Sequence, residues 1–379
     1  MNPDRVVGPD VVLPGSEQLA PVVFGLLAFI AFVVFVVALA VRIVRNRRRP
    51  EGEPARRPIV VGAAALAVVA LVALTAVNLP PPFTSPEFPP IGRLFPDEAF
   101  FYRPVGDLPV AEGSERTIAA MGPAEIVAGF GGQPHDGVVW GIPFNLADDA
   151  TPRESVEIRT YPDTSFIGEY PVTDPAYIES MPSYGVDNHY IALDRSSGRM
   201  WELFATSVWF GRWGASSGAL WDLDELTFPK WSTTAAQLPL LPGVLSYDEI
   251  ERGRVDHVVH ATTTNISSTG VVWPARATDG RNTDPAAVPM GAWLRLRDDV
   301  DLDALELGPQ ARIIAEGLRE YGMVLSDSSA NFALRGTPDA RWDRQDLDTL
   351  RALTAADLEV VDVRGVVVSP DSMEARPPG

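Results

Sequence analysis

The chain has 379 residues, a formal net charge of −19 and no cysteine. Disulfide bonds and thiol chemistry are therefore excluded, and the acidic balance disfavours binding to nucleic acid or to anionic lipid. Apolar residues make up 46% of the sequence, which allows a sizeable core without covalent cross-links.

Two apolar segments near the N-terminus, Pro21–Val44 and Pro58–Val77, each have about the 20 residues needed to cross a hydrocarbon core of roughly 30 Å. Arg42, at the exit of the first, is the only charge in either segment, which argues against a channel or proton relay. The loop between them is rich in arginine and is expected on the cytoplasmic side. A cleaved signal peptide would have a shorter apolar core, and a buried hairpin would need a larger soluble core.

These segments predict a multi-pass plasma-membrane protein whose C-terminal part lies outside the cytoplasm, with the lipid bilayer as its partner. The predicted organisation is a short outer N-terminus (1–20), membrane helices (21–44 and 58–79) around a cytoplasmic loop (45–57), a proline-rich tether (80–97), an ectodomain (98–368) and a disordered tail (369–379).

The ectodomain shows many short β-rich runs separated by Gly, Pro, Asp and Asn, such as HYIALD, RMWELF and GAWLRLR. Convincing helices are few: Pro309–Tyr321, which is followed by Gly322, then Arg344–Leu353 and Ser114–Met121. This pattern predicts a mainly-β fold, an antiparallel sandwich or barrel with a few short helices. No glycine-rich nucleotide motif is present, so we expect no nucleotide and no cofactor.

The first candidate site is a β-hairpin over residues 186–204. If Leu193 pairs with Met200, then Ile191 faces Glu202 and His189 faces Phe204. Side chains alternate along strands, and directly opposed residues share a face. The register therefore places three groups suited to acid/base catalysis on one face: Asp187, His189 and Glu202. In the competing interpretation, Asp187 caps a turn and His189 lies in a polar layer.

Two further carboxylates, Asp248 and Asp327, are secondary catalytic candidates. Asp248 follows a Pro-Gly turn, and with Glu249 it could equally begin a helix. His257 and His260 are three residues apart, which puts them on opposite faces of a strand and makes them poor metal co-ligands. Motifs with strong metal spacing are absent, and no metal is predicted.

Aromatic residues are dense between positions 201 and 231. Their faces can stack on sugars, while nearby carboxylates bind the hydroxyl groups. Tryptophans in a β-sandwich also commonly belong to the core, so both interpretations stay open. The candidate ligand-binding residues are Trp201, Trp209, Trp213 and Trp221.

The segment LPGVLSYDEIERGRVDHVVHATT (241–263) and the segment from Tyr321 to Asp362, which begins YGMVLSDSSANFALRG, resemble a group of secreted bacterial, actinobacterial-type proteins of unassigned activity. The resemblance also includes the hairpin His189–Phe204 and the W-D-L sequence at Trp221–Leu223, and it covers about residues 100–365. The group often has D-N-G where this chain has Asp327-Ser328-Ser329, and a basic residue where it has Asn188. The resemblance implies secretion and a shared domain, and it implies no mechanism.

Together these features favour a membrane-anchored envelope protein that acts on or binds cell-envelope carbohydrate, such as cell-wall glycan, by carboxylate acid/base chemistry. The alternative is a non-catalytic envelope-binding or protein-interaction module. Carboxylates that converge in the fold would favour the enzyme, and a flat aromatic patch would favour the binding module.

Overall fold

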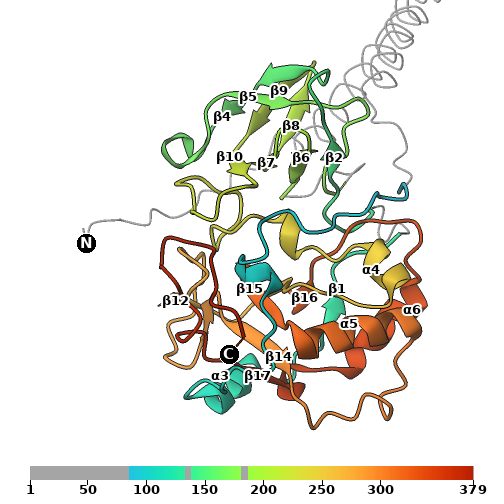
Figure 1. Cartoon of the computed structure of the whole chain (residues 1–379), viewed down its shortest axis with the longest axis vertical. Coiled ribbons are helices and arrows are strands. Elements are labelled where there is room, and N and C mark those ends of the chain that lie inside the picture. Colours follow the sequence, from blue (N-terminus) through green and yellow to red (C-terminus); the bar gives the residue numbers. More distant parts are fainter. Residues whose placement is uncertain (1–84, 133–137, 181–186, 379) are drawn as a thin grey trace, which may run out of the picture. The chain divides into compact units, whose positions relative to one another are not determined.

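The computed structural model describes residues 85–132, 138–180 and 187–378, which belong to one compact unit that begins at residue 83. The two predicted membrane segments lie outside these residues. Within the described part, no helix is long and apolar enough to cross a bilayer. The unit is mainly β with a few short helices, as the sequence predicted (Figure 1).

The first sheet has the strand order β10-β7-β6-β2. Its strands are β2 (Asn145–Leu146), β6 (Tyr190–Asp194), β7 (Arg199–Phe204) and β10 (Ser217–Asp222). Strands β6 and β7 form the predicted hairpin, with Leu193 paired to Met200 and Ile191 to Glu202. The predicted register is therefore confirmed.

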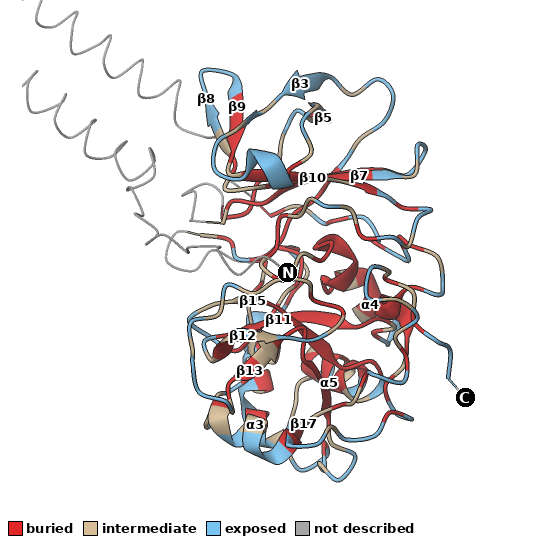
Figure 2. Ribbon diagram, turned by 90° about the vertical axis from the view of Figure 1, so that its left-hand side faces the viewer, coloured by how far each residue is buried: buried red, intermediate tan, exposed pale blue. Residues whose placement is uncertain are grey.

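This first sheet is buried on both faces because its side chains alternate between two cores. On β6, Ile191 and Leu193 join the larger core, whereas Tyr190 and Ala192 join a smaller one. The smaller core is covered by two small sheets. Their strands are β3 (Arg153–Ser155) with β5 (Glu169–Pro171), and β4 (Glu157–Ile158), β9 (Arg212–Ala215) and β8 (Ser207–Trp209). Of these strands, β3 and β8 are largely exposed and β9 is largely buried (Figure 2).

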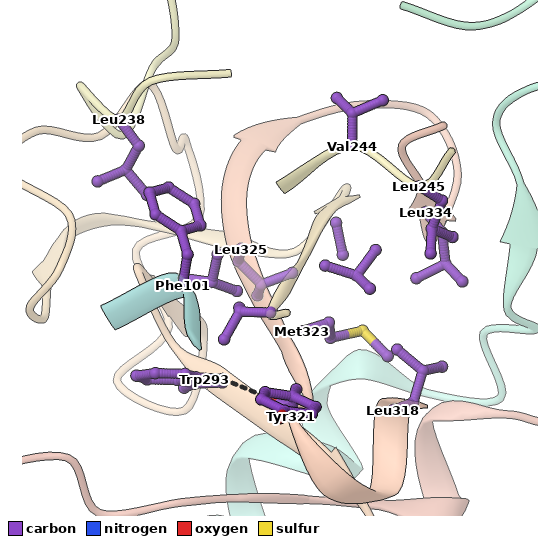
Figure 3. Close-up of a cluster of buried hydrophobic side chains, with 14 of the residues drawn as sticks. Phe101, Leu238, Val244, Leu245, Trp293, Leu318, Tyr321, Met323, Leu325 and Leu334 are labelled. Carbon is purple, nitrogen blue, oxygen red and sulfur yellow. Dashed lines mark hydrogen bonds between the residues drawn. The ribbon is translucent and has the colours of Figure 1, made fainter. Parts of the chain in front are cut away.

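The second sheet has the strand order β1-β16-β11-β15-β14-β17. Its strands are β1 (Val127–Ala128), β11 (Val259–Thr263), β14 (Trp293–Leu296), β15 (Met323–Ser328), β16 (Ala333–Leu334) and β17 (Leu358–Val360). Beside it, β12 (Ile266–Val271) pairs with β13 (Val288–Met290). Figure 3 shows part of the core on this sheet, where Trp293 Nε1 donates to the carbonyl oxygen of Tyr321 at 2.9 Å.

The expectation of antiparallel sheets needs correction, because the sheets are mixed. Parallel pairs are β11 with β15, β1 with β16, β2 with β6, β4 with β9, and β12 with β13. A parallel pair needs a long crossover between its strands. Between β11 and β15 the chain forms β12, β13, β14 and α5, and such a distant pairing leaves no local pattern in the sequence.

The predicted helices are present near their expected bounds. They are α3 (Ser114–Met121), α5 (Pro309–Glu320) and α6 (Arg344–Asp348). The short α4 (Tyr247–Arg252) has Asp248-Glu249 in its first turn, as the sequence allowed. Single 3-10 turns occur at Phe100–Tyr102, Pro162–Thr164, Leu241–Gly243, Thr349–Ala352 and Ala355–Asp357. Beyond α5, Gly322 adopts a positive φ of 72°, which suits a glycine that ends a helix.

The predicted tether and tail differ from expectation where the structure describes them. Phe88, Ile91 and Phe95 of the tether are buried in the larger core. In the tail, Met373 is fully buried, and its carbonyl oxygen accepts a hydrogen bond from the Phe100 amide at 2.8 Å. Apolar side chains spaced among prolines were enough to dock both segments onto the domain, so neither is a free spacer.

Candidate functional site

Five charged side chains from separate segments gather at the end of β15. Glu179, Asp187 and His189 come from the chain that leads into β6, Asp327 lies near the end of β15, and Arg335 directly follows β16. Asp187, His189 and Asp327 were predicted as catalytic from the sequence, and the structure brings these three together. We call these five residues the Arg335 cluster.

The base of the cluster is a buried ion pair. His189 Nδ1 lies 2.7 Å from Glu179 Oε2, and the His189 amide donates to the same oxygen at 3.2 Å. Burial alone would lower the pKa of His189, but the adjacent Glu179 carboxylate raises it to about 9, so the ring is an imidazolium at neutral pH. His189 Nε2 lies 3.3 Å from the carbonyl oxygen of Thr233, which fits a second ring donor.

Arg335 links this pair to the more exposed Asp187. Its guanidinium lies 3.7 Å from Glu179 Oε1 and 3.9 Å from Asp187 Oδ2. The Arg335 amide donates to the carbonyl oxygen of His260 on β11 at 2.9 Å, so the sheet fixes the backbone that carries the guanidinium. Arg335 is therefore a positioned cation between two carboxylates, one buried and one 43% exposed.

An irregularity in the second sheet sets the direction of the Asp327 side chain. The β11–β15 register shifts between Ala261 and Thr262, which leaves Thr262 opposite Asp327. Bulges of this kind redirect side chains and are common beside active sites. Burial raises the pKa of Asp327 to about 7, with Arg335 opposing the shift and the carboxylates of Asp279 and Asp187 adding to it.

The pKa of Asp187 is also raised, first by burial and then by the negative charge of Glu179. The Arg335 cluster therefore contains two carboxyl groups, Asp187 and Asp327, that hold protons more tightly than usual, next to a fixed guanidinium. Carboxyl groups with perturbed pKa values beside a cation are typical of sites that transfer protons, although ion-pair networks also produce them.

Glu202 lies on the same face of the hairpin as His189 but has a different environment. It is fully buried, and its carboxylate accepts from Trp221 Nε1 at 3.0 Å, Thr233 Oγ1 at 2.7 Å and the Leu240 amide at 2.8 Å. Three donors satisfy the carboxylate within the core. Its catalytic role stays a prediction, and the surroundings favour a structural one.

Asp248 lies away from this cluster, in the first turn of α4, where Ser246 Oγ donates to it at 2.6 Å and Arg252 lies 3.3 Å away. Next to it, His257 Nε2 is 3.0 Å from Glu249 Oε1, beside a small cavity of about 40 Å³. His260 is buried, and burial lowers its pKa to about 3. These groups do not join Asp187 or Asp327.

The four candidate tryptophans do not form one surface. Trp201, Trp213 and Trp221 are buried at 2%, 9% and 1% exposure, and the first two belong to the smaller core. Trp209 is 59% exposed at the end of β8. Ligand stacking therefore stays a prediction for Trp209, while the burial of the other three fits the core interpretation.

Sequence reasoning missed Glu179 and Arg335 as members of the site, and Asp279 as a neighbouring charge that affects Asp327. Glu179 and Arg335 are far apart in the chain and lie in no motif, so only the fold reveals their contact. A larger cavity, of about 960 Å³, was also unforeseen; it lies beside α3 and is lined by Val110, Trp273, Pro289, Val363 and Arg364, among others.

Among the residues that the structure describes, no group of three or more His, Asp or Glu side chains is arranged to hold a metal ion. No family model, curated protein or solved structure matches this chain. The chemistry of the Arg335 cluster is therefore the main guide to function.

Proposed function

We propose that the protein is a membrane-anchored extracytoplasmic enzyme that acts on cell-envelope carbohydrate by carboxylate acid/base chemistry at the Arg335 cluster. The observation that carries this proposal is the Asp327 carboxyl, whose pKa burial raises to about 7 and which feels the charges of Arg335 and Asp187. A carboxyl group with this pKa exists in both protonation states near neutral pH, as a general acid requires.

In the proposed reaction, Asp327 donates its proton to the leaving oxygen of a glycosidic bond. Asp187, the more exposed carboxylate, accepts a proton from the attacking water. Arg335 stabilises negative charge at the reacting oxygens, and the Glu179 carboxylate, itself bound to His189, holds Arg335 in place. Asp327 loses one proton and Asp187 gains one, so the total number of protons on the enzyme is unchanged. Proton exchange with solvent then returns Asp327 to its acid form and Asp187 to its carboxylate form.

The test compares D327N and D187N with the intact full-length chain for release of reducing ends from purified bacterial cell-wall glycan. Each change should lower the rate about 10²–10⁴-fold, the usual contribution of a general acid or base. D327N should also remove the limb of the rate profile near pH 7. The matched control is D163N, at an exposed carboxyl in a turn.

Folding can be checked separately in this experiment. Burial disfavours the Asp327 carboxylate, so the neutral amide should leave D327N at least as stable as the parent above pH 7. A well-folded D327N that retains full activity would refute the assignment.

The non-catalytic alternative is favoured by the cavity of about 960 Å³ beside α3. Its lining combines apolar residues such as Val110 and Trp273 with charged residues such as Arg364, and this combination is typical of a binding site. If this cavity binds envelope glycan, V110D, at a side chain 48% exposed, should weaken glycan binding measured by calorimetry while D327N should not. The reverse result would favour the Arg335 cluster.

We also propose the topology that the arginine-rich loop predicts, with residues 45–57 in the cytoplasm and the C-terminal unit outside. Alkaline phosphatase is active only outside the cytoplasm. A fusion at the C-terminus should therefore be active, and a fusion within the loop should be silent. The opposite pattern would reverse the assignment.

A further inference from the structure

The β8–β9 hairpin has an aromatic tip that the proposed catalytic site does not use. Trp209 pairs with Arg212, and Phe210 and Gly211 form the two-residue turn between them. Trp209 is 59% exposed, Phe210 is 70% exposed and the neighbouring Val208 is 37% exposed. Three consecutive apolar side chains therefore face solvent at the end of a hairpin. We call Val208–Gly211 the aromatic tip.

Folding does not explain the phenylalanine at this turn. Phe210 and Gly211 have φ angles of 48° and 75°, the combination of a type I′ turn. Such turns favour Asn-Gly, because a bulky residue at positive φ is strained. Phe210 adopts this strained backbone conformation although its ring lies mostly outside the core. A strained residue whose side chain is not part of either core points to a contact with something else.

The geometry of the two rings distinguishes between possible partners. The Trp209 and Phe210 rings are 4.9 Å apart and nearly perpendicular, at 82°. Perpendicular rings form a wedge, whereas a sugar-binding platform presents a flat aromatic face beside polar groups. A wedge of Trp and Phe suits the boundary between headgroups and acyl chains, where tryptophan is enriched.

Two further features fit a lipid surface. The hairpin pairs its own backbone from Ser207–Gly214 to Trp209–Arg212, so the tip can leave water with few unsatisfied backbone groups. Arg212, which pairs with Trp209 at the base of the turn, is exposed. The net charge of the chain is negative, but this exposed arginine beside apolar side chains can attract anionic headgroups locally.

We propose that the aromatic tip contacts the lipid bilayer and gives the extracytoplasmic unit a second attachment to the membrane. This inference rests on the membrane-anchored part of the proposed function and is independent of catalysis at the Arg335 cluster. The contact would hold the domain in one orientation close to the bilayer, rather than leaving it free at the end of its anchor.

The test uses the full-length chain in vesicles of phosphatidylcholine and phosphatidylglycerol. The chain has no cysteine, so V208C gives a single site for an environment-sensitive fluorophore within the tip, next to the two rings. Lipids that carry a quencher in their acyl chains should quench this fluorophore. The added double substitution W209S/F210S should abolish the quenching. The matched control I167S, at another apolar side chain 66% exposed, should leave it unchanged.

The possible failures are distinguishable. If the chain does not float with the vesicles, both the anchor and the tip contact are refuted. If it floats but the fluorophore stays in water, or if quenching survives W209S/F210S, only the tip contact is refuted. Protection of the fluorophore by soluble cell-wall glycan without vesicles would assign the tip to carbohydrate instead.

Discussion

His189 and Glu179 show how a buried pair can serve a more exposed site. His189 is 1% exposed and Glu179 is 5% exposed, so neither reaches a substrate directly. The Glu179 carboxylate, which His189 holds in place, instead attracts Arg335, and Arg335 in turn faces Asp187. A single unpaired charge in the core would destabilise the fold. The opposite charges of His189 and Glu179 stabilise each other.

The first prediction concerns this pair. In E179Q, His189 loses its counter-charge, so its pKa should fall from about 9 and the protein should lose about 3–5 kcal/mol of stability, as for one partner of a buried pair. The His189 pKa is raised in the folded state. The stabilisation that protonated His189 gives to the folded state is therefore fully present below its ordinary pKa of 6.5 and is lost as the pH rises toward 9.

The measurement is the free energy of unfolding against pH, combined with NMR titration of the histidine ring. Glu179 has a lowered pKa, so its own contribution is present above its ordinary value of 4.5 and is lost as pH falls further. The difference between parent and E179Q should thus be largest near pH 5–6 and shrink above pH 9. The exposed E157Q should change stability by less than about 0.5 kcal/mol.

Among the elements, α5 depends on a neighbour for its N-terminal cap. Its N-cap residue is Gly308, which has no side chain to accept a hydrogen bond. Asp346 of α6 supplies the acceptors instead, from the Gln310 amide and the Ala311 amide at 2.9 Å each. A carboxylate at this end also interacts favourably with the helix dipole.

The second prediction follows from this cap. D346A should destabilise the protein by about 1–2 kcal/mol, the range for loss of an N-cap acceptor. Chemical denaturation measures the change, and hydrogen exchange should show faster opening at the start of α5. D348A is the matched control, because Asp348 is on the same helix, is 53% exposed and lies 3.8 Å from Arg344. Equal losses in the two variants would contradict the capping argument.

The elements that could be predicted from the sequence are those with local causes. The β6–β7 hairpin follows from alternation around one turn, and α5 follows from Pro309 and Gly322. The parallel pairing of β11 with β15 has no local signal. The candidate site divides in the same way: Asp187 and His189 were predicted together from one short segment, which directly precedes β6, whereas their contacts with Glu179 and Arg335 depend on the complete fold.

At the scale of the whole unit, the first sheet separates the two hydrophobic cores and contributes side chains to both. Trp221 of β10 packs in the larger core and Trp201 of β7 in the smaller one. The Arg335 cluster lies where the chain entering this sheet meets the second sheet. Shifts of one sheet relative to the other would therefore move Asp187 relative to Asp327, which ties the integrity of the site to the packing of the whole unit.

The ends of the described chain contribute directly to that packing. The Ala375 amide donates to the carbonyl oxygen of Glu98 at 2.8 Å, and the Met373 amide donates to that of Leu226 at 2.6 Å. The C-terminal segment therefore ties the beginning of the domain to the chain that follows the first sheet. Met373, at 0% exposure, fills the core at this junction.

The last prediction uses two truncations of the full chain. Ending the protein after Val368 removes the Met373 side chain and these backbone contacts. Deletion of a buried methionine side chain alone costs about 2–5 kcal/mol, so the loss of stability should be at least this large. Ending it after Arg376 removes only Pro377, Pro378 and Gly379, and should leave the free energy of unfolding unchanged. Equal stability of both truncated forms would mean that the tail does not support the core.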